Sequence, residues 1–386
     1  MKRIEYSIKH NRFVQFLYVK FFSFLFTVFS FFTPIDKKLI LINSFSGKKF
    51  NDSPKTIYDF LKKNNMLDDY KIVWAFEDPA LFEQFKLQTV KINSFKYFRI
   101  AFKAKYWITN VNIERGLKFK KRNQIYLNTW HGTGPKTIGN AVTGRNDYNF
   151  KKVNYLCADG EYLKNIFVQN FNAKPESILL CGRPREDILY HPNFEIKRAI
   201  QKKYSLNDKD FVILYAPTWR EPKNKKSDSS LTIELDIQMI LNSIPNSKVL
   251  FRAHSITSEV VMKEVFGERF ISVTDEPDIG DLFFATDVLI TDYSSANLDF
   301  VILKKPFICF APDYEEYVKE RALCFDLKKE YPFGVQFTTE EVIDVLKQII
   351  DGDRKESEFA KFKEKYGPYG GDATNICIKM LFGDNK

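Results

Sequence analysis

The feature that most constrains this chain is a repeated alternation of short apolar runs with stretches that carry helical spacing. Apolar runs of this length are typical of buried strands. Their alternation with helices favours parallel sheets covered on both faces, because a parallel crossover needs a connection of helix length. The strand candidates are 38–43, 70–76, 106–109, 125–127, 155–158, 177–180, 211–216, 248–253, 287–290 and 307–311.

A polar, charged stretch from Arg183 to Asp210 interrupts this alternation. We therefore predict two successive α/β domains of ordinary size, at 37–190 and 205–366. The last segment, 367–386, is predicted to be a helix that packs back on the first domain. Neither GxGxxG nor GxxxxGK[ST] occurs, which removes the usual support for a dinucleotide-binding or P-loop protein.

Residues 13–32 form an aromatic-rich run of twenty residues in which Lys20 is the only charge. A helix of this length is about 30 Å long and could cross a bilayer. The central lysine, and Phe in place of Leu and Ile, favour instead a helix in the headgroup region, while a spanning helix and a buried helix stay open. No small-residue cleavage site follows, which argues against a signal peptide. We predict residues 1–36 to be a membrane-associating helix at the cytoplasmic face of the cell membrane.

Lys and Arg together number 59, against 49 for Asp and Glu, which favours anionic partners such as phosphates, nucleic acid or acidic lipid. Solvated basic faces would give the same surplus. The five cysteines are odd in number and include no CxxC pair, so neither a disulfide framework nor a zinc site is indicated.

Four strand candidates end in polar side chains that packing does not require, and ligands of open α/β sheets bind at such ends. His131 and His254 have the side chain whose pKa suits proton transfer near neutrality. Ser294 and Ser295 offer hydroxyl and N–H groups to a phosphate. The four segments are 130–136 (WHGTGPK), 215–220 (YAPTWR), 251–255 (FRAHS) and 289–295 (LITDYSS).

Each segment alone has a simpler interpretation. A serine pair after a strand is more often a plain helix cap, His254 could be a structural histidine, and Arg220 could pair with a surface carboxylate. Because all four coincide at strand ends in both halves of the chain, together they favour a nucleotide-diphosphate site between two domains.

The segments 130–139, 215–220, 252–255 and 291–295 resemble, in this order, the motif series of the CDP-glycerol glycerophosphotransferase family. That family makes teichoic acids and related polyol-phosphate capsular polymers. The segments SFSGKKFNDSP (44–54) and GRPRED (182–187) resemble two further motifs of it, and the resemblance covers about 40 to 375. Gly134–Pro135, and the absence of an arginine from 371–375, depart from the family pattern; these departures leave the reaction class unchanged and the polyol and acceptor open.

The resemblance implies a GT-B-like fold, in which two Rossmann-like domains face each other across a cleft with the nucleotide mainly on the second. The implied reaction transfers glycerol phosphate from CDP-glycerol to a hydroxyl of a lipid-linked teichoic acid or capsular acceptor and releases CMP. His131 would be the catalytic base, and the second catalytic residue, His254, would hold the pyrophosphate. The implied substrate-binding residues are Trp130, Gly132, Thr133, Lys136, Arg183, Pro217, Thr218, Arg220, Arg252, Thr291, Asp292, Ser294 and Ser295.

No cofactor and no tightly bound metal are expected, because no DxD-type ligand cluster lies near these motifs. The expected partners are CDP-glycerol or CDP-ribitol, the lipid-linked acceptor and the membrane surface, without nucleic acid. Two other functions stay open: a glycosyltransferase that uses a nucleotide sugar on the same frame, and a non-catalytic membrane protein that binds nucleotide or anionic polymer. The sequence does not distinguish primase from polymerase.

Overall fold

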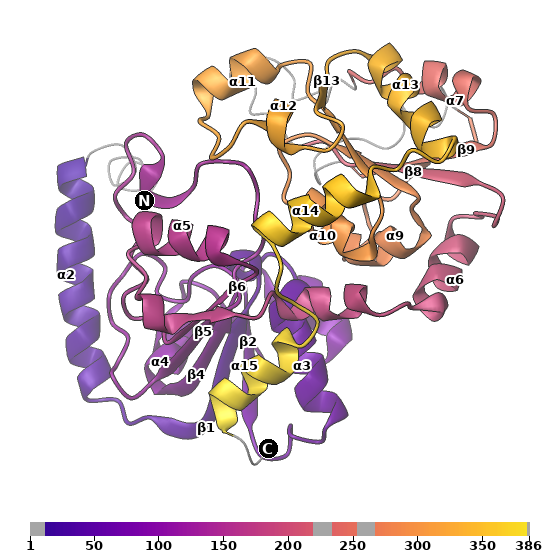
Figure 1. The fold of residues 1–386 in the computed structure, drawn as a ribbon. Helices are drawn as coiled ribbons and strands as arrows, with labels where there is room; N and C mark the ends of the chain where they lie inside the picture. The colour runs from indigo at the N-terminus through magenta and orange to yellow at the C-terminus, as the bar shows by residue number, and fades with distance from the viewer. Residues whose placement is uncertain (1–11, 219–233, 253–266, 384–386) are drawn as a thin grey trace.

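The computed structural model describes residues 12–218, 234–252 and 267–383 of the 386-residue chain. These residues form two parallel sheets with helices on their faces, stacked as a lower and an upper lobe in Figure 1. We call the lobe around the first sheet the first domain and the lobe around the second sheet the second domain.

The first sheet has the strand order β3-β2-β1-β4-β5-β6-β7, and all its neighbouring strands are parallel. The order reverses between β1 and β4, where a doubly wound sheet opens a crevice at its carboxyl ends. Its strands are β1 (Asp36–Asn43), β2 (Lys71–Phe76), β3 (Thr89–Lys91), β4 (Ala104–Thr109), β5 (Ile125–Asn128), β6 (Tyr155–Ala158) and β7 (Ile178–Leu180).

The second sheet repeats this arrangement in the order β10-β9-β8-β11-β12-β13, again with parallel neighbours. Its reversal lies between β8 and β11. The predicted α/β class with parallel sheets is therefore confirmed. The strands are β8 (Phe211–Tyr215), β9 (Ser247–Phe251), β10 (Phe270–Ser272), β11 (Val288–Thr291), β12 (Phe307–Phe310) and β13 (Val335–Gln336).

Several helices begin at a side-chain cap, among them α4, α6, α7, α12 and α13. In α13 the Thr338 hydroxyl accepts from Glu341 N while the Glu341 carboxylate accepts from Thr338 N, which forms a capping box. The described helices are α2 (Arg12–Phe31), α3 (Asp52–Lys63), α4 (Phe95–Lys103), α5 (Glu161–Phe171), α6 (Phe194–Lys203), α7 (Ile237–Ser243), α9 (Ile279–Ala285), α10 (Ala296–Phe300), α11 (Tyr314–Glu320), α12 (Leu327–Glu330), α13 (Thr339–Ile350), α14 (Glu356–Tyr366) and α15 (Ala373–Phe382).

The chain passes between the domains twice. It leaves the first domain through the 3-10 helix Pro184–Tyr190 and α6, and it returns after α14. The last described helix, α15, then packs in the core of the first domain through Ala373, Cys377 and Leu381. Figure 1 shows α15 beside the lower sheet, while α14 stays with the upper one.

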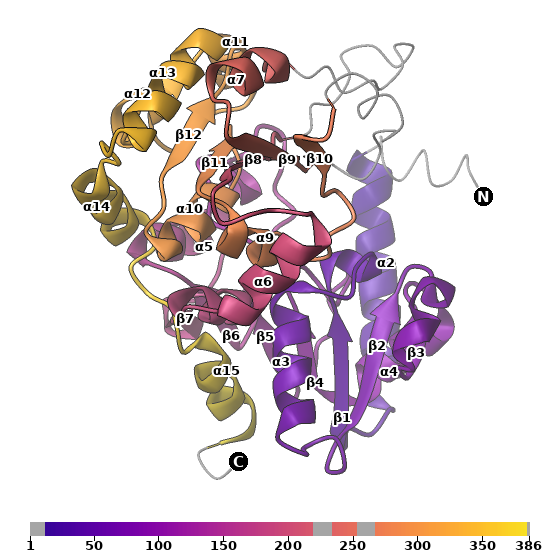
Figure 2. The ribbon, with the colours of Figure 1, turned by 90° about the vertical axis from the view of Figure 1, so that its right-hand side faces the viewer.

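Helix α2 lies along the outer side of the first domain (Figures 1 and 2). One of its faces packs on the domain, because Phe26 contacts the rings of Phe98, Phe102 and Phe119. Its other face is exposed and aromatic, with Phe24 71% exposed. Within the described residues, no helix combines the length and apolar character needed to cross a membrane.

Candidate active site

A cavity of about 710 Å³ opens where the carboxyl ends of the two sheets meet. It lies beside the reversal point of each sheet, the place where doubly wound folds bind ligands. Both domains line it, with side chains that include Phe45, Lys49, Asn51, Asp52, His131, Arg185, Arg252, Asp278, Asp281, Ser294 and Ser295.

The loop after β5 is anchored in the core by its tryptophan. Trp130 N donates to the Asn128 side-chain oxygen at 2.9 Å, and Trp130 adopts a φ of 55°, which is rare for a large side chain. Its ring is buried against Phe167 and Phe171. The next residue, His131, lines the cavity.

His131 is held in a single tautomer by the backbone beside it. Its Nδ1 lies 2.8 Å from the Asn110 carbonyl oxygen. Since a carbonyl only accepts, the proton is on Nδ1 and the lone pair is on Nε2. Burial lowers the pKa of His131, although the Asn110 carbonyl and the Asp52 carboxylate oppose that shift. His131 is therefore neutral near pH 7, the form that accepts a proton.

Gly132 brings this loop against the second domain. Its φ is 151°, and a Cβ added there would lie 2.8 Å from the Cβ of Ser295 and closer still to its Oγ. A side chain at this position would push the two domains apart. Ser295 and Ser294 line the cavity from the second domain, beside the His131 loop.

Arg185 joins the two domains behind His131. It donates to the His131 carbonyl oxygen at 3.0 Å and pairs with Asp52 of the first domain. Its other terminal nitrogen lies 2.6 Å from a carboxylate oxygen of Asp299, in α10 of the second domain. A single guanidinium thus connects the histidine loop to both walls of the cavity.

Arg183 extends this network into the interior. It is only 1% exposed and lies 3.0 Å from Asp159, 2.5 Å from Glu186 and 3.2 Å from Asp299. It also donates to the Thr133 hydroxyl at 2.9 Å. Burial raises the pKa of Glu186, so this carboxyl takes up a proton more readily than an exposed one. Arg183 supports the walls of the cavity and is not open to a substrate.

Two cations of opposite domains reach the cavity. Arg252 donates to the carbonyl oxygens of Val273 at 3.2 Å and Glu276 at 2.7 Å, which fixes its side chain. Lys49 reaches the cavity from the first domain, and burial together with the charge of Arg252 lowers its pKa. Two cations close enough to repel each other are suited to a bound anion.

The ends of β8 and β11 are joined by side chains that the sequence singled out. The backbone N–H and the hydroxyl of Thr218 donate to the Asp292 carboxylate. The Thr291 hydroxyl donates to the Ala216 carbonyl at 2.7 Å. Pro217, half-buried, lies between these two connections. These contacts hold the ends of the two strands together, and none of these residues lines the cavity.

The predicted site residues therefore separate into three groups. His131, Arg252, Ser294 and Ser295 line the cavity. His254 and Arg220 lie outside the described residues. The others do not line the cavity: they are Trp130, Gly132, Thr133, Arg183, Pro217, Thr218, Thr291 and Asp292, together with Lys136, which bridges to Leu323 of the second domain.

Sequence reasoning missed several cavity residues of both domains. Asp52 and Arg185 fall in the segments 44–54 and 182–187, which resemble family motifs, and that signal could have selected them. Asp278 and Asp281 had no such signal. Burial raises the pKa of Asp281 to about 6. In the part of the chain that the structure describes, these carboxylates do not converge closely enough to form a metal site.

The fold and the cavity define a class of protein, a two-domain α/β protein with a cavity between two Rossmann-like parallel sheets. A family model for CDP-glycerol:poly(glycerophosphate) glycerophosphotransferases matches residues 25–381. The chain belongs to this family, which the model describes as glycerophosphotransferases that act with CDP-glycerol.

Curated relatives agree with this assignment. The chain is 30% identical over 386 residues to the teichoic acid poly(glycerol phosphate) polymerase of Bacillus spizizenii. This alignment covers 95% of this chain and 97% of the relative. It is 34% identical to the teichoic acid glycerol-phosphate transferase of Staphylococcus aureus, over 81% of this chain and 84% of the relative.

Solved structures give the same result. A variant of the wall teichoic acid polymerase TagF matches with a TM-score of 0.80 and 27% identity, over 90% of this chain and 89% of that one. A putative UDP-N-acetylglucosamine 2-epimerase from Listeria monocytogenes matches with a TM-score of 0.55 and 11% identity, which shows the shared fold alone.

Proposed function

We propose that this chain transfers glycerol phosphate from CDP-glycerol to a hydroxyl of a lipid-linked teichoic acid or capsular acceptor, with release of CMP. The observation that carries the proposal is the geometry of His131. Its Nδ1 proton is fixed on the Asn110 carbonyl, and its ring faces a cavity between two nucleotide-binding-type sheets. Family membership supplies the donor.

In the proposed reaction, Nε2 of His131 takes the proton of the acceptor hydroxyl as its oxygen attacks the phosphorus that carries glycerol. The bond from this phosphorus to the bridging oxygen breaks, and CMP leaves with the bond electrons. A positioned base contributes about 10²- to 10⁴-fold to such a step. In this reaction the protein forms no covalent bond with the transferred glycerol phosphate.

The charge of the diphosphate needs fixed donors, which are the usual main contribution to phosphoryl transfer. We assign this role to Arg252 and to the serine pair Ser294–Ser295, which line the cavity from the second domain. Lys49 is a further cation on the side of the first domain. His254 and Arg220 keep their proposed roles at the phosphates, on sequence grounds.

The proposal also specifies the polyol of the donor as glycerol, not ribitol. Glycerol is favoured because the relatives with 30% and 34% identity are glycerol-phosphate enzymes. A ribitol-phosphate polymerase of Staphylococcus aureus is more distant, at 24% identity. The family match also favours glycerol phosphate over the sugar of a nucleotide-sugar glycosyltransferase.

The test is CMP release by the purified chain with a short lipid-linked acceptor analogue and either CDP-glycerol or CDP-ribitol. We expect release with CDP-glycerol, and a loss of about 10²-fold or more in His131→Ala, with donor affinity retained. Release that survives in His131→Ala would refute the assigned base. Tight binding of CDP without release from either donor would refute the reaction.

We propose further that the chain works at the cytoplasmic face of the membrane, where a lipid-linked acceptor is met. The exposed aromatic face of α2 supports this proposal, because an apolar helix face of this kind suits the boundary of headgroups and acyl chains.

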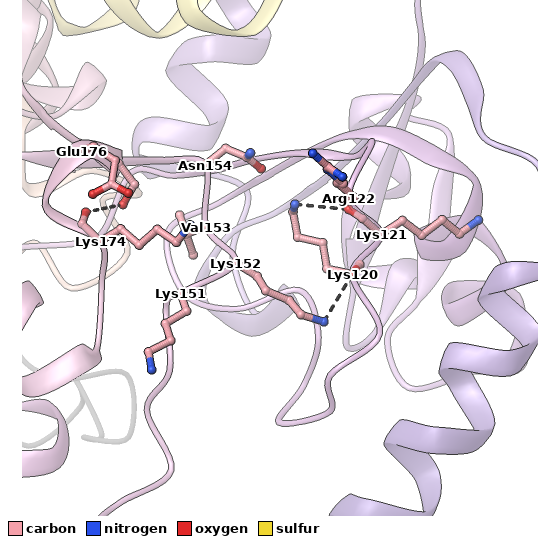
Figure 3. A pocket seen from close by; sticks show the side chains of 10 residues that line it. Lys120, Lys121, Arg122, Lys151, Lys152, Val153, Asn154, Lys174 and Glu176 are labelled. Carbon is pink, nitrogen blue, oxygen red and sulfur yellow. Dashed lines mark hydrogen bonds between the residues drawn. The ribbon is translucent and has the colours of Figure 1, made fainter.

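A basic pocket beside the end of α2 adds a second argument for the membrane surface. It has a volume of about 570 Å³, and Figure 3 shows the side chains that line it. They come from the segments that precede β5, β6 and β7 in the sequence. Lys121 donates to the Thr33 carbonyl, which ties the pocket to the end of α2. Cations next to exposed aromatic residues suit an anionic lipid surface. The basic lining residues are Lys120, Lys121, Arg122, Lys151, Lys152 and Lys174.

A further inference from the structure

Three of the five cysteines, far apart in the sequence, meet inside the first domain. Cys157 lies in β6, Cys181 follows β7, and Cys377 lies in α15. Their sulfur atoms all lie within 4.8 Å of one another, and those of Cys157 and Cys377 are 3.5 Å apart. All three side chains are buried. Their spacing in the sequence gave no sign of this cluster.

The cluster is separate from the proposed reaction. None of the three cysteines lines the cavity between the domains. They belong to an apolar core cluster that includes Ile42, Leu127 and Ile378. In such surroundings a thiol has only weak hydrogen bonds available, such as the contact from Cys181 Sγ to the Gly182 carbonyl at 3.3 Å.

We propose that Cys157, Cys181 and Cys377 form a binding site for a soft cation such as Cu⁺ or Zn²⁺. Three sulfurs around Zn²⁺ at its usual bond length would lie about 3.8–4.0 Å apart. The observed separations, from 3.5 Å to within 4.8 Å, bracket this range. Each thiol that coordinates gives up its proton to solvent.

The ligand set favours Cu⁺ over Zn²⁺. Within the described residues, no His, Asp or Glu joins the three sulfurs. Zn²⁺ in structural sites almost always takes four ligands, whereas an all-sulfur set selects soft cations such as Cu⁺.

The location of the ligands gives the site a structural role. Two ligands belong to the edge of the first sheet, and the third belongs to α15, which enters this domain from the second. A bound cation would therefore tie α15 to β6 and β7. Because the cation binds only the folded arrangement, its binding free energy adds to the stability of that arrangement.

The test uses the full chain, reduced and freed of metal, titrated separately with Cu⁺ and with Cd²⁺ as a spectroscopic substitute for Zn²⁺. We expect one cation per chain, an ultraviolet sulfur-to-metal charge-transfer band, and a higher Tm in the presence of the cation. Cys157→Ala and Cys377→Ala should each weaken binding at least tenfold. Cys309→Ala, at a buried thiol of the second domain, is the matched control and should bind as the parent does.

The proposal is overturned if the parent chain binds neither cation, or if the variants bind as tightly as the parent. It is also overturned if mass spectrometry of the untreated protein finds Cys157 and Cys377 joined in a disulfide. If an alanine variant does not fold, Cys181→Ser takes its place. The cation should then raise the Tm of Cys181→Ser less than that of the parent, and an equal rise would overturn the proposal. CMP release is not part of the readout, so this result is independent of the proposed reaction.

Discussion

At the scale of single residues, Gly132 is packed tightly against Ser295 of the second domain. We predict that Gly132→Ala lowers CMP release by about 10²-fold, because a new Cβ would collide with Ser295 and displace the His131 loop. Steady-state CMP release, with Tm as the folding check, measures this effect.

Ser295→Gly provides the matched test of that explanation. It removes the two side-chain atoms that the new Cβ would meet, so the double variant should recover part of the lost activity relative to Gly132→Ala. If Ser295→Gly alone is active and the double variant is as impaired as Gly132→Ala, the backbone conformation at Gly132 and not the contact is responsible.

The protonation of His131 predicts the acid side of the pH profile. Burial lowers its pKa, so the neutral base persists below the ordinary histidine value of about 6.5. The rate of CMP release should therefore hold from pH 7 down past that value, and then fall as Nε2 is protonated.

The Asp52 carboxylate raises the pKa of His131 and so gives this prediction a control. In Asp52→Asn the acid side of the profile should move to still lower pH. A shift to higher pH would show that the limiting group is not His131.

At the scale of elements, the two faces of α2 should respond differently to substitution. Phe21→Ser with Phe24→Ser, at positions 60% and 71% exposed, should weaken binding to vesicles of anionic lipid and leave Tm unchanged. Phe26→Ala should lower stability by about 3 kcal/mol or less, since its half-buried ring packs on three others. Vesicle sedimentation and thermal unfolding separate the two effects.

The basic pocket beside α2 is tested in the same assay. Lys151→Glu with Lys152→Glu should weaken binding to anionic vesicles, with little effect on neutral ones, and added salt should reduce the difference. Unchanged vesicle binding in both pairs of variants would count against the membrane proposal.

The sequence predicted the central elements well and the edges of the sheets poorly. Each strand candidate coincides with a strand, because buried strands carry continuous apolar runs. The strands β3, β10 and β13 were missed: they lie at sheet edges and have only two or three residues, too few to show a period. The edge strand β7 is equally short but was found, because all three of its residues are apolar.

The prediction of the cavity residues from the sequence was limited in a similar way. Strand ends located His131, Arg252 and the serine pair, because topology places such ends together. The partnership of Arg185 with Asp52 and Asp299 depends on residues more than a hundred positions apart, which no local pattern reveals. Arg183 matched a family segment, yet it is buried in that network.

At the scale of the whole molecule, Asp299 holds the domains in register. It accepts from Arg183 and Arg185 together, and both arginines belong to the other domain. Asp299→Ala should lower the free energy of unfolding by about 3–5 kcal/mol, because it removes the shared partner of the buried Arg183 and the partly buried Arg185. Urea unfolding measures this loss.

A surface pair supplies the matched control for Asp299→Ala. Lys365 pairs with Glu330 at 2.7 Å, with both side chains partly exposed to solvent. Lys365→Ala should therefore cost about 1 kcal/mol or less. An equally small cost for Asp299→Ala would show that the arginines find other partners.

The return of α15 to the first domain has a consequence for the nascent chain. The last strand of the first sheet ends at Leu180, yet the helix that completes its core begins at Ala373. At ordinary rates of translation the ribosome needs roughly ten to forty seconds to make the intervening residues. During that interval the apolar surface that later receives α15 is exposed to solvent. The first domain is therefore synthesised first but completes its folding last. We expect it to be the part of the nascent chain that depends most on a chaperone.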